Sequence, residues 1–287
     1  MIWRGVVSVV ATLRGTIGTG YFGGAGVLLC AGVAAAQQRQ LGVDVSHFQA
    51  EKGISQASWN AMRADGKEFV WIKATEGLLP PGNVDPAWQN NVTRASAAGI
   101  RAGVYHFGRP DNRPTVTGAI QEAGHFVATA GSAMGVGNLR PVLDLERGNA
   151  LSTSELTDWV LAFVNEVVNL KGPAAEPIVY TSLFYATFEL DSRVANLDSW
   201  LRDINGQNPQ TGAPSTTGQF NNWTAWQYSQ TGSSGGISPL DLDVIHSEYK
   251  PLSALVVPDP ATLAPATLSG AWVMCQRRWR RLARHSV

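Results

Sequence analysis

Apolar runs of strand length recur along this chain, and several of them lead directly into polar residues. Residues 41–43 lead into Asp44, and residues 141–143 lead into Asp144. Segments with helical periodicity separate the early runs, and strands that alternate with helices form a parallel sheet, closed or open. In a parallel α/β barrel the carboxyl ends of the strands meet at one face, where active sites are built. Polar side chains at several strand ends are therefore expected to meet in one pocket.

Eight strands and four helices are predicted between residues 41 and 245. The fourth helix begins with a capping box, in which Ser152 is followed by Glu155. The later strands have no helices of comparable strength between them. We therefore expect an α/β barrel of the TIM-like type that is irregular in its second half. The predicted strands are 41–48, 68–75, 101–107, 140–146, 177–182, 199–204, 224–229 and 240–245, and the predicted helices are 57–65, 86–98, 115–130 and 153–170.

Composition and charge restrict the class of ligand. Only 15% of residues are charged while there are ten Trp, which fits a ligand bound by ring stacking and neutral hydrogen bonds, such as a sugar. Any single Trp can equally belong to the core. Residues 41–250 carry 14 basic and 21 acidic residues, a net charge of −7, which argues against nucleic acid as the main ligand. Cys30 and Cys275 lie outside this segment and the five His have no metal-type spacing, so neither a metal nor another cofactor is expected.

The first 36 residues have the composition of a targeting segment. Arg4 and Arg14 precede an apolar run that ends in three alanines, residues 34–36. This pattern predicts a signal peptide cleaved near Ala36 and a secreted or periplasmic protein. The alternative is an uncleaved signal anchor, which would hold the protein at a membrane.

The remaining chain divides into three parts by composition. Residues 37–250 form the predicted catalytic domain, and residues 251–270, rich in Pro, Ala, Thr and Leu, resemble a linker. Residues 271–287 form a basic tail that contains Arg and Trp. Such a tail either makes electrostatic contact with an anionic wall or membrane, or is a chain end without a role. The protein is expected to be a monomer.

Asp144 and Glu146 are the central catalytic candidates. Because they are two residues apart on a predicted strand, they point to the same face, roughly 7 Å apart at the backbone. Two carboxyl groups that close cannot both ionise freely, which favours a protonated acid beside an anion, as a glycosidase requires. A bare pair of this kind more often caps a loop or forms an ion pair. Asp44 and Asp241, at the ends of other predicted strands, favour catalysis.

Other polar residues on the predicted strands are candidate pocket residues. Lys73 and Glu76 are expected to form an ion pair at the floor or rim of the pocket. His47 and His106 fit hydrogen-bonding wall residues, and the alternative, metal ligation together with the aspartates, lacks the usual spacing. The run of Trp226, Gln227 and Tyr228 is a candidate sugar platform, although Trp226 fits a core position equally well.

Taken in order, these motifs resemble glycoside hydrolase family 25, the lysozymes of bacteria, fungi and phages often called the Chalaropsis type. The similarity covers about residues 41–247, and several spaced motifs in order are far more specific than any one alone. The matching stretches are residues 42–49, 69–77, 97–100, 103–107, 141–146, 178–182, 226–229 and 240–243.

The resemblance implies a flattened, irregular β/α barrel with β-1,4-N-acetylmuramidase activity on bacterial peptidoglycan. It implies that Glu146 is the proton donor and that Asp144 stabilises the reacting centre or orients the substrate N-acetyl group. Asp44 and Asp241 would complete an acidic floor. The aromatic positions that line the groove match Tyr105, Tyr180 and Trp226.

One residue departs from the family pattern: Asp243 stands where Asn is common, which adds a negative charge that either affects the acid or pairs with a neighbour. Two other functions are compatible with the sequence. One is a related glycosidase on a chitin-like N-acetylated glycan, and the other is a non-catalytic protein that binds cell wall. Retention of all four acidic positions favours an enzyme.

Overall fold

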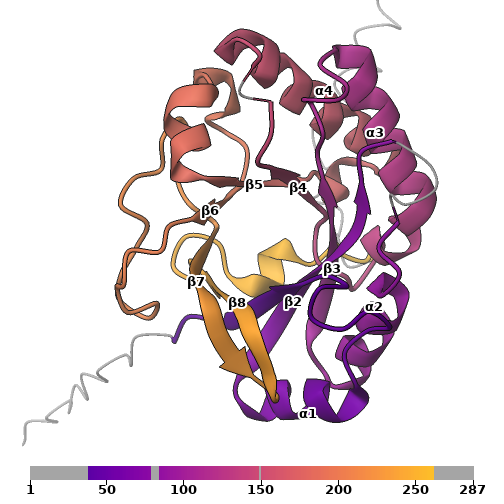
Figure 1. Cartoon of the computed structure of the whole chain (residues 1–287), viewed down its shortest axis with the longest axis vertical. Coiled ribbons are helices and arrows are strands. Elements are labelled where there is room, and N and C mark those ends of the chain that lie inside the picture. Colours follow the sequence, from indigo (N-terminus) through magenta and orange to yellow (C-terminus); the bar gives the residue numbers. More distant parts are fainter. Residues whose placement is uncertain (1–37, 79–83, 149, 262–287) are drawn as a thin grey trace, which may run out of the picture. The chain divides into compact units, whose positions relative to one another are not determined.

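The computed structural model describes residues 38–78, 84–148 and 150–261. The predicted leader and the basic tail lie outside these residues. Within them, eight strands close into one barrel whose spatial order follows the sequence (Figure 1). The strands are β1 (Leu41–Val45), β2 (Lys67–Glu76), β3 (Arg101–Phe107), β4 (Val142–Leu145), β5 (Ile178–Ser182), β6 (Ser199–Arg202), β7 (Ala225–Ser234) and β8 (Ile237–Ile245).

The barrel is parallel from β1 to β7, and β8 runs antiparallel to both of its neighbours, β7 and β1. The expected irregular second half is thereby confirmed, whereas the reversal of β8 was not predicted. Its cause is local: Gly235 and Gly236 both have positive φ, 57° and 79°, and connect β7 to β8. A connection of two such residues forms a hairpin, whereas parallel strands need a crossover of a dozen residues or more.

Four helices cover the side of the barrel formed by the early strands (Figure 1). They are α1 (Gln56–Ala64), α2 (Trp88–Ala97), α3 (Val116–Ala130) and α4 (Thr153–Lys171), each within a few residues of its prediction. The capping box of α4 is present, since the Ser152 side chain and the Glu155 side chain bond to each other's backbone N–H. Between β5 and β7 the covering consists of loops and short helical turns, so only one half of the barrel has regular helices.

Side chains alternate between two cores along each strand. The outer core lies between strands and helices, whereas the inner core fills the barrel with aromatic rings such as Phe69 and Trp71. Glycines make room for these rings: a Cβ on Gly42 would lie 2.4 Å from the Phe69 ring, and one on Gly103 would lie 2.8 Å from Trp71. The lower barrel is therefore a packed core, and the room for a ligand lies above it, at the carboxyl ends of the parallel strands.

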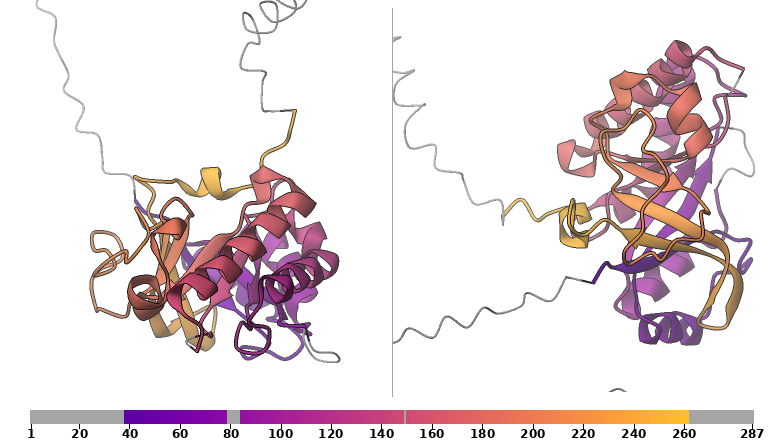
Figure 2. Two further views of the ribbon diagram at one scale, coloured as in Figure 1. Left: turned by 90° about the horizontal axis from the view of Figure 1, so that it is seen from above. Right: turned by 90° about the vertical axis from the view of Figure 1, so that its left-hand side faces the viewer.

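Residues 251–257, predicted as the start of a linker, pack across the opposite end of the barrel (Figure 2). Leu255 is fully buried and belongs to the inner core. The Arg140 N–H donates to the Leu255 carbonyl over 2.8 Å, and the Val257 N–H donates to the Asn138 carbonyl over 2.9 Å. The packed part of the chain therefore extends beyond residue 250, because the apolar residues of this Pro- and Leu-rich segment close the floor of the barrel. None of the described helices is long and apolar enough to span a membrane.

Candidate active site

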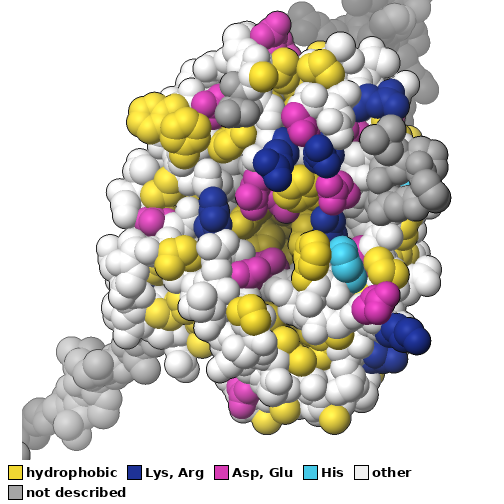
Figure 3. All heavy atoms as spheres, viewed as in Figure 1, with side chains coloured by type: hydrophobic (Ala, Val, Ile, Leu, Met, Phe, Trp, Pro, Cys, Tyr) yellow, Lys and Arg dark blue, Asp and Glu magenta, His cyan; other side chains and the backbone are white. Residues whose placement is uncertain are grey.

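A pocket of about 210 Å³ opens at the carboxyl ends of the parallel strands. Acidic, basic and apolar side chains surround a hollow in the face seen in Figure 3. The pocket therefore has the mixed charged and aromatic lining that suits a polar ligand with flat rings. The lining residues are Asp44, Val45, Ser46, Phe48, Gln49, Lys73, Tyr105, Phe107, Asp144, Glu146, Tyr180, Trp200, Gln227, Gln230 and Asp241.

All four predicted acidic residues line this one pocket. Asp44 and Asp144 lie in β1 and β4 and are each only 8% exposed, whereas Glu146 follows the end of β4 and is more accessible. The position of Asp241 in the barrel differs from the expected one. It lies within the antiparallel strand β8, directly opposite Asp44, rather than at the carboxyl end of a parallel strand.

Crowding and burial raise the pKa values of three of these carboxyl groups. Burial, and then the charge of Asp241, raise the pKa of Asp44 well above its usual range. Burial, and then the charges of Glu146 and Asp44, do the same to the pKa of Asp144. Burial and Glu146 raise the pKa of Asp241 to about 6. Three carboxyl groups of the pocket therefore hold their protons to a higher pH than a free carboxyl group does.

Gln227 on β7 connects two walls of the pocket. Its Nε2 donates to Asp44 Oδ2 over 2.7 Å, and its Oε1 accepts from the Tyr180 hydroxyl over 2.9 Å. Both ends of the amide are therefore fixed, and the hydrogen bond from Gln227 partly offsets the effect of burial on the pKa of Asp44. Gln227 thus holds Asp44 and Tyr180 in one geometry.

Trp200 on β6, which was not among the predicted site residues, forms part of the pocket floor. Its ring centroid lies 4.6 Å from that of Trp71 and 4.6 Å from that of Tyr180. The indole N–H donates over 3.0 Å to Asp243 Oδ1, which is fully buried in the barrel. Burial, followed by the charges of Asp44 and Asp241, raises the pKa of Asp243 well above its usual range. Asp243, the residue that departs from the family pattern, is therefore a buried acid beneath the pocket.

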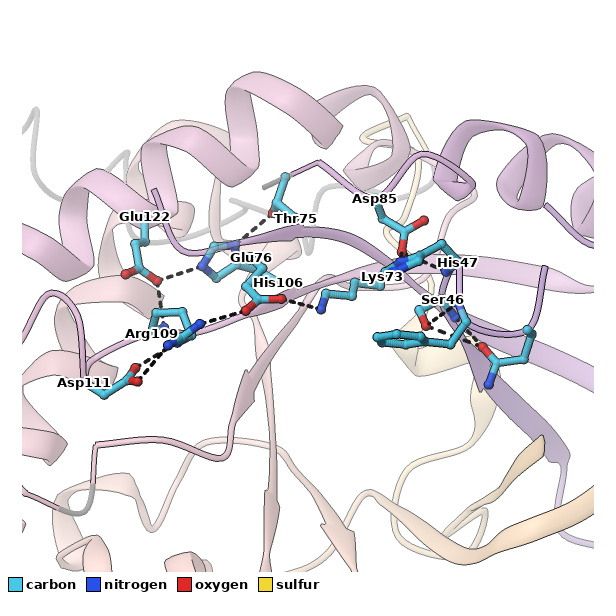
Figure 4. A network of polar contacts seen from close by, with 12 residues as sticks. Ser46, His47, Lys73, Thr75, Glu76, Asp85, His106, Arg109, Asp111 and Glu122 are labelled. Atoms are coloured by element: carbon cyan, nitrogen blue, oxygen red, sulfur yellow. Dashed lines mark hydrogen bonds and ion pairs between the residues drawn. The ribbon is translucent and has the colours of Figure 1, made fainter. Parts of the chain in front are cut away.

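Lys73 and Glu76 form the expected ion pair, with 2.6 Å between Lys73 Nζ and Glu76 Oε2. Glu76 also accepts from Arg109, whose Nη1 lies 2.9 Å from Glu76 Oε1 and whose Nη2 lies 2.8 Å from Asp111 Oδ2 (Figure 4). Lys73 lines the pocket, whereas Glu76 lies outside its lining. Glu76 therefore acts on the pocket through Lys73, whose position it fixes.

The family model described as glycosyl hydrolases family 25 matches residues 43–237, which is more than half of the chain. The chain belongs to glycosyl hydrolases family 25. The family match ends before Asp241 and does not cover this residue. The pairing register of β8 with β1 places Asp241 opposite Asp44 and so beside the other acidic residues.

Curated relatives of this family 25 chain carry lysozyme and muramidase names. Lysozyme M1 of Streptomyces globisporus is 29% identical over 207 residues, which cover 69% of this chain and 64% of the relative. The autolytic lysozyme of Clostridium acetobutylicum is 31% identical over 209 residues, with 72% and 57% covered. The N,O-diacetylmuramidase of Chalaropsis is 31% identical over 148 residues, with 49% and 65% covered. The matched region thus spans less than two thirds of each relative's length.

Solved structures agree with the barrel. The bacterial lysozyme from Streptomyces coelicolor superposes with a TM-score of 0.61 at 27% identity and covers 76% of this chain and 96% of its own. The family 25 lysozyme from Aspergillus fumigatus gives a TM-score of 0.61 at 25% identity, with 76% and 99% covered. The predicted single β/α-barrel domain is therefore confirmed at the level of the fold.

His106, a candidate substrate contact, faces away from the pocket of this family 25 barrel. It is fully buried behind β3, where Nδ1 lies 2.8 Å from Thr75 Oγ1 and Nε2 lies 2.9 Å from Glu122 Oε2 (Figure 4). Neighbouring residues on a strand point to opposite faces, so Tyr105 in the pocket places His106 in the outer core. This corrects the prediction of a wall residue.

His47 also has a partner outside the pocket lining, because its Nδ1 lies 2.8 Å from Asp85 Oδ2. In the part of the chain that the structure describes, no group of three His, Cys, Asp or Glu side chains could hold a metal ion. The alternative in which His47 and His106 ligate a metal together with the aspartates therefore has no geometric support.

Residues 226–228, the candidate sugar platform, also point alternately to the two faces of their strand. Gln227 faces the pocket, whereas Trp226 is fully buried in the outer core and donates its indole N–H to the Asp203 carbonyl over 2.7 Å. Tyr228 packs beside Trp226, with 5.8 Å between ring centroids. Trp226 and Tyr228 therefore do not form a platform at the pocket; Trp200 and the exposed ring of Phe48 line it in this family 25 chain.

Proposed function

We propose that this chain is a lysozyme that hydrolyses β-1,4 bonds between N-acetylmuramic acid and N-acetylglucosamine in bacterial peptidoglycan. The observation that carries the proposal is the meeting of Asp44, Asp144, Glu146 and Asp241 in one pocket of a family 25 barrel. The lysozyme and muramidase names of its relatives support the choice of substrate.

In this proposal Glu146 protonates the glycosidic oxygen. It follows β4 at the mouth of the pocket and is more accessible than Asp44 or Asp144, which are each only 8% exposed. An acid catalyst must come within hydrogen-bond distance of the leaving oxygen, and the accessible carboxyl group meets this requirement best.

Asp144 would stabilise the positive charge that develops at the reacting sugar, or orient the N-acetyl group beside it. It lies on the inner face of β4 close to Glu146, and its Oδ1 is buried without a hydrogen-bond donor among the described residues. A carboxyl group left without a donor is available to a substrate N–H or to an oxocarbenium-like centre. Asp44 and Asp241 would maintain the acidic floor, and Tyr105, Tyr180 and Trp200 would contact the sugar rings.

The ends of the chain supply the cellular context of the proposal. Residues 1–36 would direct export to the wall, with cleavage near Ala36 or retention as an anchor. Residues 271–287 would attract the protein to an anionic wall or membrane, because they carry five Arg. Deleting 271–287 should then weaken co-sedimentation with cell wall at low salt but not at high salt. Equal sedimentation of both forms at low salt would show that the tail does not attach the protein.

The test of the function is mass spectrometry of the fragments released from purified peptidoglycan. A muramidase leaves new reducing ends on N-acetylmuramic acid. New reducing ends on N-acetylglucosamine, or release of fragments from chitin alone, would replace the proposal with another glycosidase. Binding to the wall without release of fragments would indicate a non-catalytic wall protein.

A further inference from the structure

Arg202 is the last residue of β6, the strand that also carries Trp200 into the pocket. Residues two apart on a strand share a face, so the Arg202 side chain follows Trp200 along the inner wall toward the mouth. In register it lies between Ser182 of β5 and Gln227 of β7. A guanidinium group therefore stands on the wall just above the aromatic floor.

The charge of Arg202 acts on two residues that line the pocket. It lowers the pKa of Asp241, although burial and Glu146 together keep that pKa raised to about 6. It also lowers the pKa of Tyr180, again against the larger effect of burial. Arg202 is not itself among the residues that line the pocket, but both residues on which its charge acts are.

The side chain of Arg202 has no acceptor among residues 38–78, 84–148 and 150–261. It donates no hydrogen bond and forms no ion pair there, and its Nε is shielded from solvent without a partner. Lys73 and Arg109, two other cations near the mouth, both bind Glu76, at 2.6 and 2.9 Å. A shielded guanidinium N–H without an acceptor costs free energy, so a ligand that supplies the acceptor would be stabilised here.

We propose that Arg202 binds a carboxylate carried by the muramic acid units of the substrate. This inference rests on the proposed muramidase function and adds to it the group that selects the substrate. Guanidinium binds carboxylate through two parallel hydrogen bonds, whereas the acidic remainder of the pocket would repel an anion. Chitin-like glycan carries only neutral N-acetylglucosamine units and offers Arg202 nothing equivalent. The carboxylate is either that of the lactyl group or the first free carboxylate of the attached peptide.

Three soluble substrates separate these sources. The first is a peptide-free oligomer of alternating N-acetylglucosamine and N-acetylmuramic acid with free lactyl carboxylates. The second is the same oligomer with each carboxylate converted to a neutral methylamide, and the third carries the peptide stems. The enzymes are the wild type, Arg202→Gln, Arg202→Lys and the control Arg101→Gln. Arg101 is an exposed residue at the start of β3, at the other end of the barrel.

The readout is the KM for each charged oligomer divided by the KM for the methylamide oligomer. Arg202→Gln should raise this ratio about tenfold, the loss of one charge-assisted contact. Arg202→Lys, which keeps the charge but not the two-point contact, should raise it less, and Arg101→Gln should leave it at the wild-type value. A change seen with the peptide-free oligomer assigns the lactyl carboxylate, and a change confined to the peptide-bearing oligomer assigns the peptide carboxylate.

The neutral oligomer also controls for an indirect effect. Loss of Arg202 would raise the pKa of Asp241, and this would act on charged and neutral oligomers alike, so it leaves the ratio unchanged. An unchanged ratio for both charged oligomers in both Arg202 variants, in the presence of wild-type hydrolysis, would overturn the assignment of Arg202 and leave the muramidase function standing. Failure of the wild type to cleave any of these oligomers would instead overturn the muramidase function itself.

Discussion

Asp44 on β1 lies directly opposite Asp241 on the antiparallel strand β8, and both carboxyl groups line the same pocket. Their pairing joins a residue near the start of the barrel to one near its end. The charge of Asp241 contributes, after burial, to the raised pKa of Asp44. The two residues therefore titrate as neighbours rather than independently.

Replacing Asp241 with Asn should lower the pKa of Asp44. Removal of a like charge on the facing strand makes ionisation of Asp44 easier, so its carboxyl carbon should titrate at lower pH in a carbon-13 nuclear magnetic resonance experiment. Asp158→Asn, at an exposed ion pair on α4, is the control and should leave the titration of Asp44 unaltered. A pKa of Asp44 that stays the same or rises in Asp241→Asn would contradict the coupling.

Replacing Glu146 with Gln should abolish lysis while the fold is retained. Gln has nearly the same shape but cannot donate a proton as an acid, and the loss should be on the order of hundredfold or more. Turbidity of a cell-wall suspension measures the rate, and circular dichroism verifies the fold. Glu166→Gln, which changes a partly exposed residue of α4 outside the pocket lining, is the matched control. Clearing at the wild-type rate by a folded Glu146→Gln protein would remove Glu146 from the mechanism.

Replacing Asp243 with Asn should stabilise the protein at neutral pH. The pKa of Asp243 is raised in the folded state above the ordinary 3.8, so its favourable contribution is complete below pH 3.8 and is lost as the pH rises through the folded value. Asn keeps an oxygen for the Trp200 indole N–H but never ionises.

We expect the free energy of unfolding of Asp243→Asn to exceed that of the wild type by on the order of 1 kcal/mol at pH 7. The difference should shrink toward pH 4. Urea denaturation at both pH values measures it. A variant that is less stable than the wild type at pH 7 would show that the buried carboxylate has a compensating partner.

Replacing Gln227 with Met should weaken both the site and the fold. The change leaves the Tyr180 hydroxyl and Asp44 Oδ2 without the hydrogen bonds of 2.9 and 2.7 Å that Gln227 supplies. Each unsatisfied buried group costs about 1–3 kcal/mol, so the free energy of unfolding should fall by at least that amount. Tyr180→Phe removes only the first bond and should cost less. Equal unfolding midpoints for the wild type and Gln227→Met would argue against the connecting role.

The sequence was sufficient to predict the strands, the helices and the acidic set, because these depend on local periodicity and on motif order. It was not sufficient to decide which way adjacent polar or aromatic residues point. Strands of this barrel are buried on both faces, so the apolar pattern does not alternate and carries no signal for the side. For that reason Trp226 and His106 were placed in the pocket, whereas Trp200 was not singled out.

The reversed strand β8 shows a different limit. Residues 240–245 were expected to form one more strand of a parallel barrel, and Asp241 was expected in the site for that reason. The Gly235-Gly236 pair was the available signal for a hairpin, since two residues with positive φ form the tight turns that connect antiparallel strands. Asp241 still reaches the pocket because register, rather than strand direction, places it opposite Asp44.

The floor formed by residues 251–257 has a consequence for how the chain matures. Strand β1 has no partner on one side until β8 has been synthesised. The inner core is not covered until Leu252 and Leu255 have been synthesised as well. During synthesis β1 and β2 therefore emerge long before the barrel can close, and the free edge of β1 is a template for wrong pairing in that interval. Contacts between such distant parts of a chain form slowly. A nascent chain halted before residue 257 should remain sensitive to protease, and resistance should appear only once this last segment has left the ribosome.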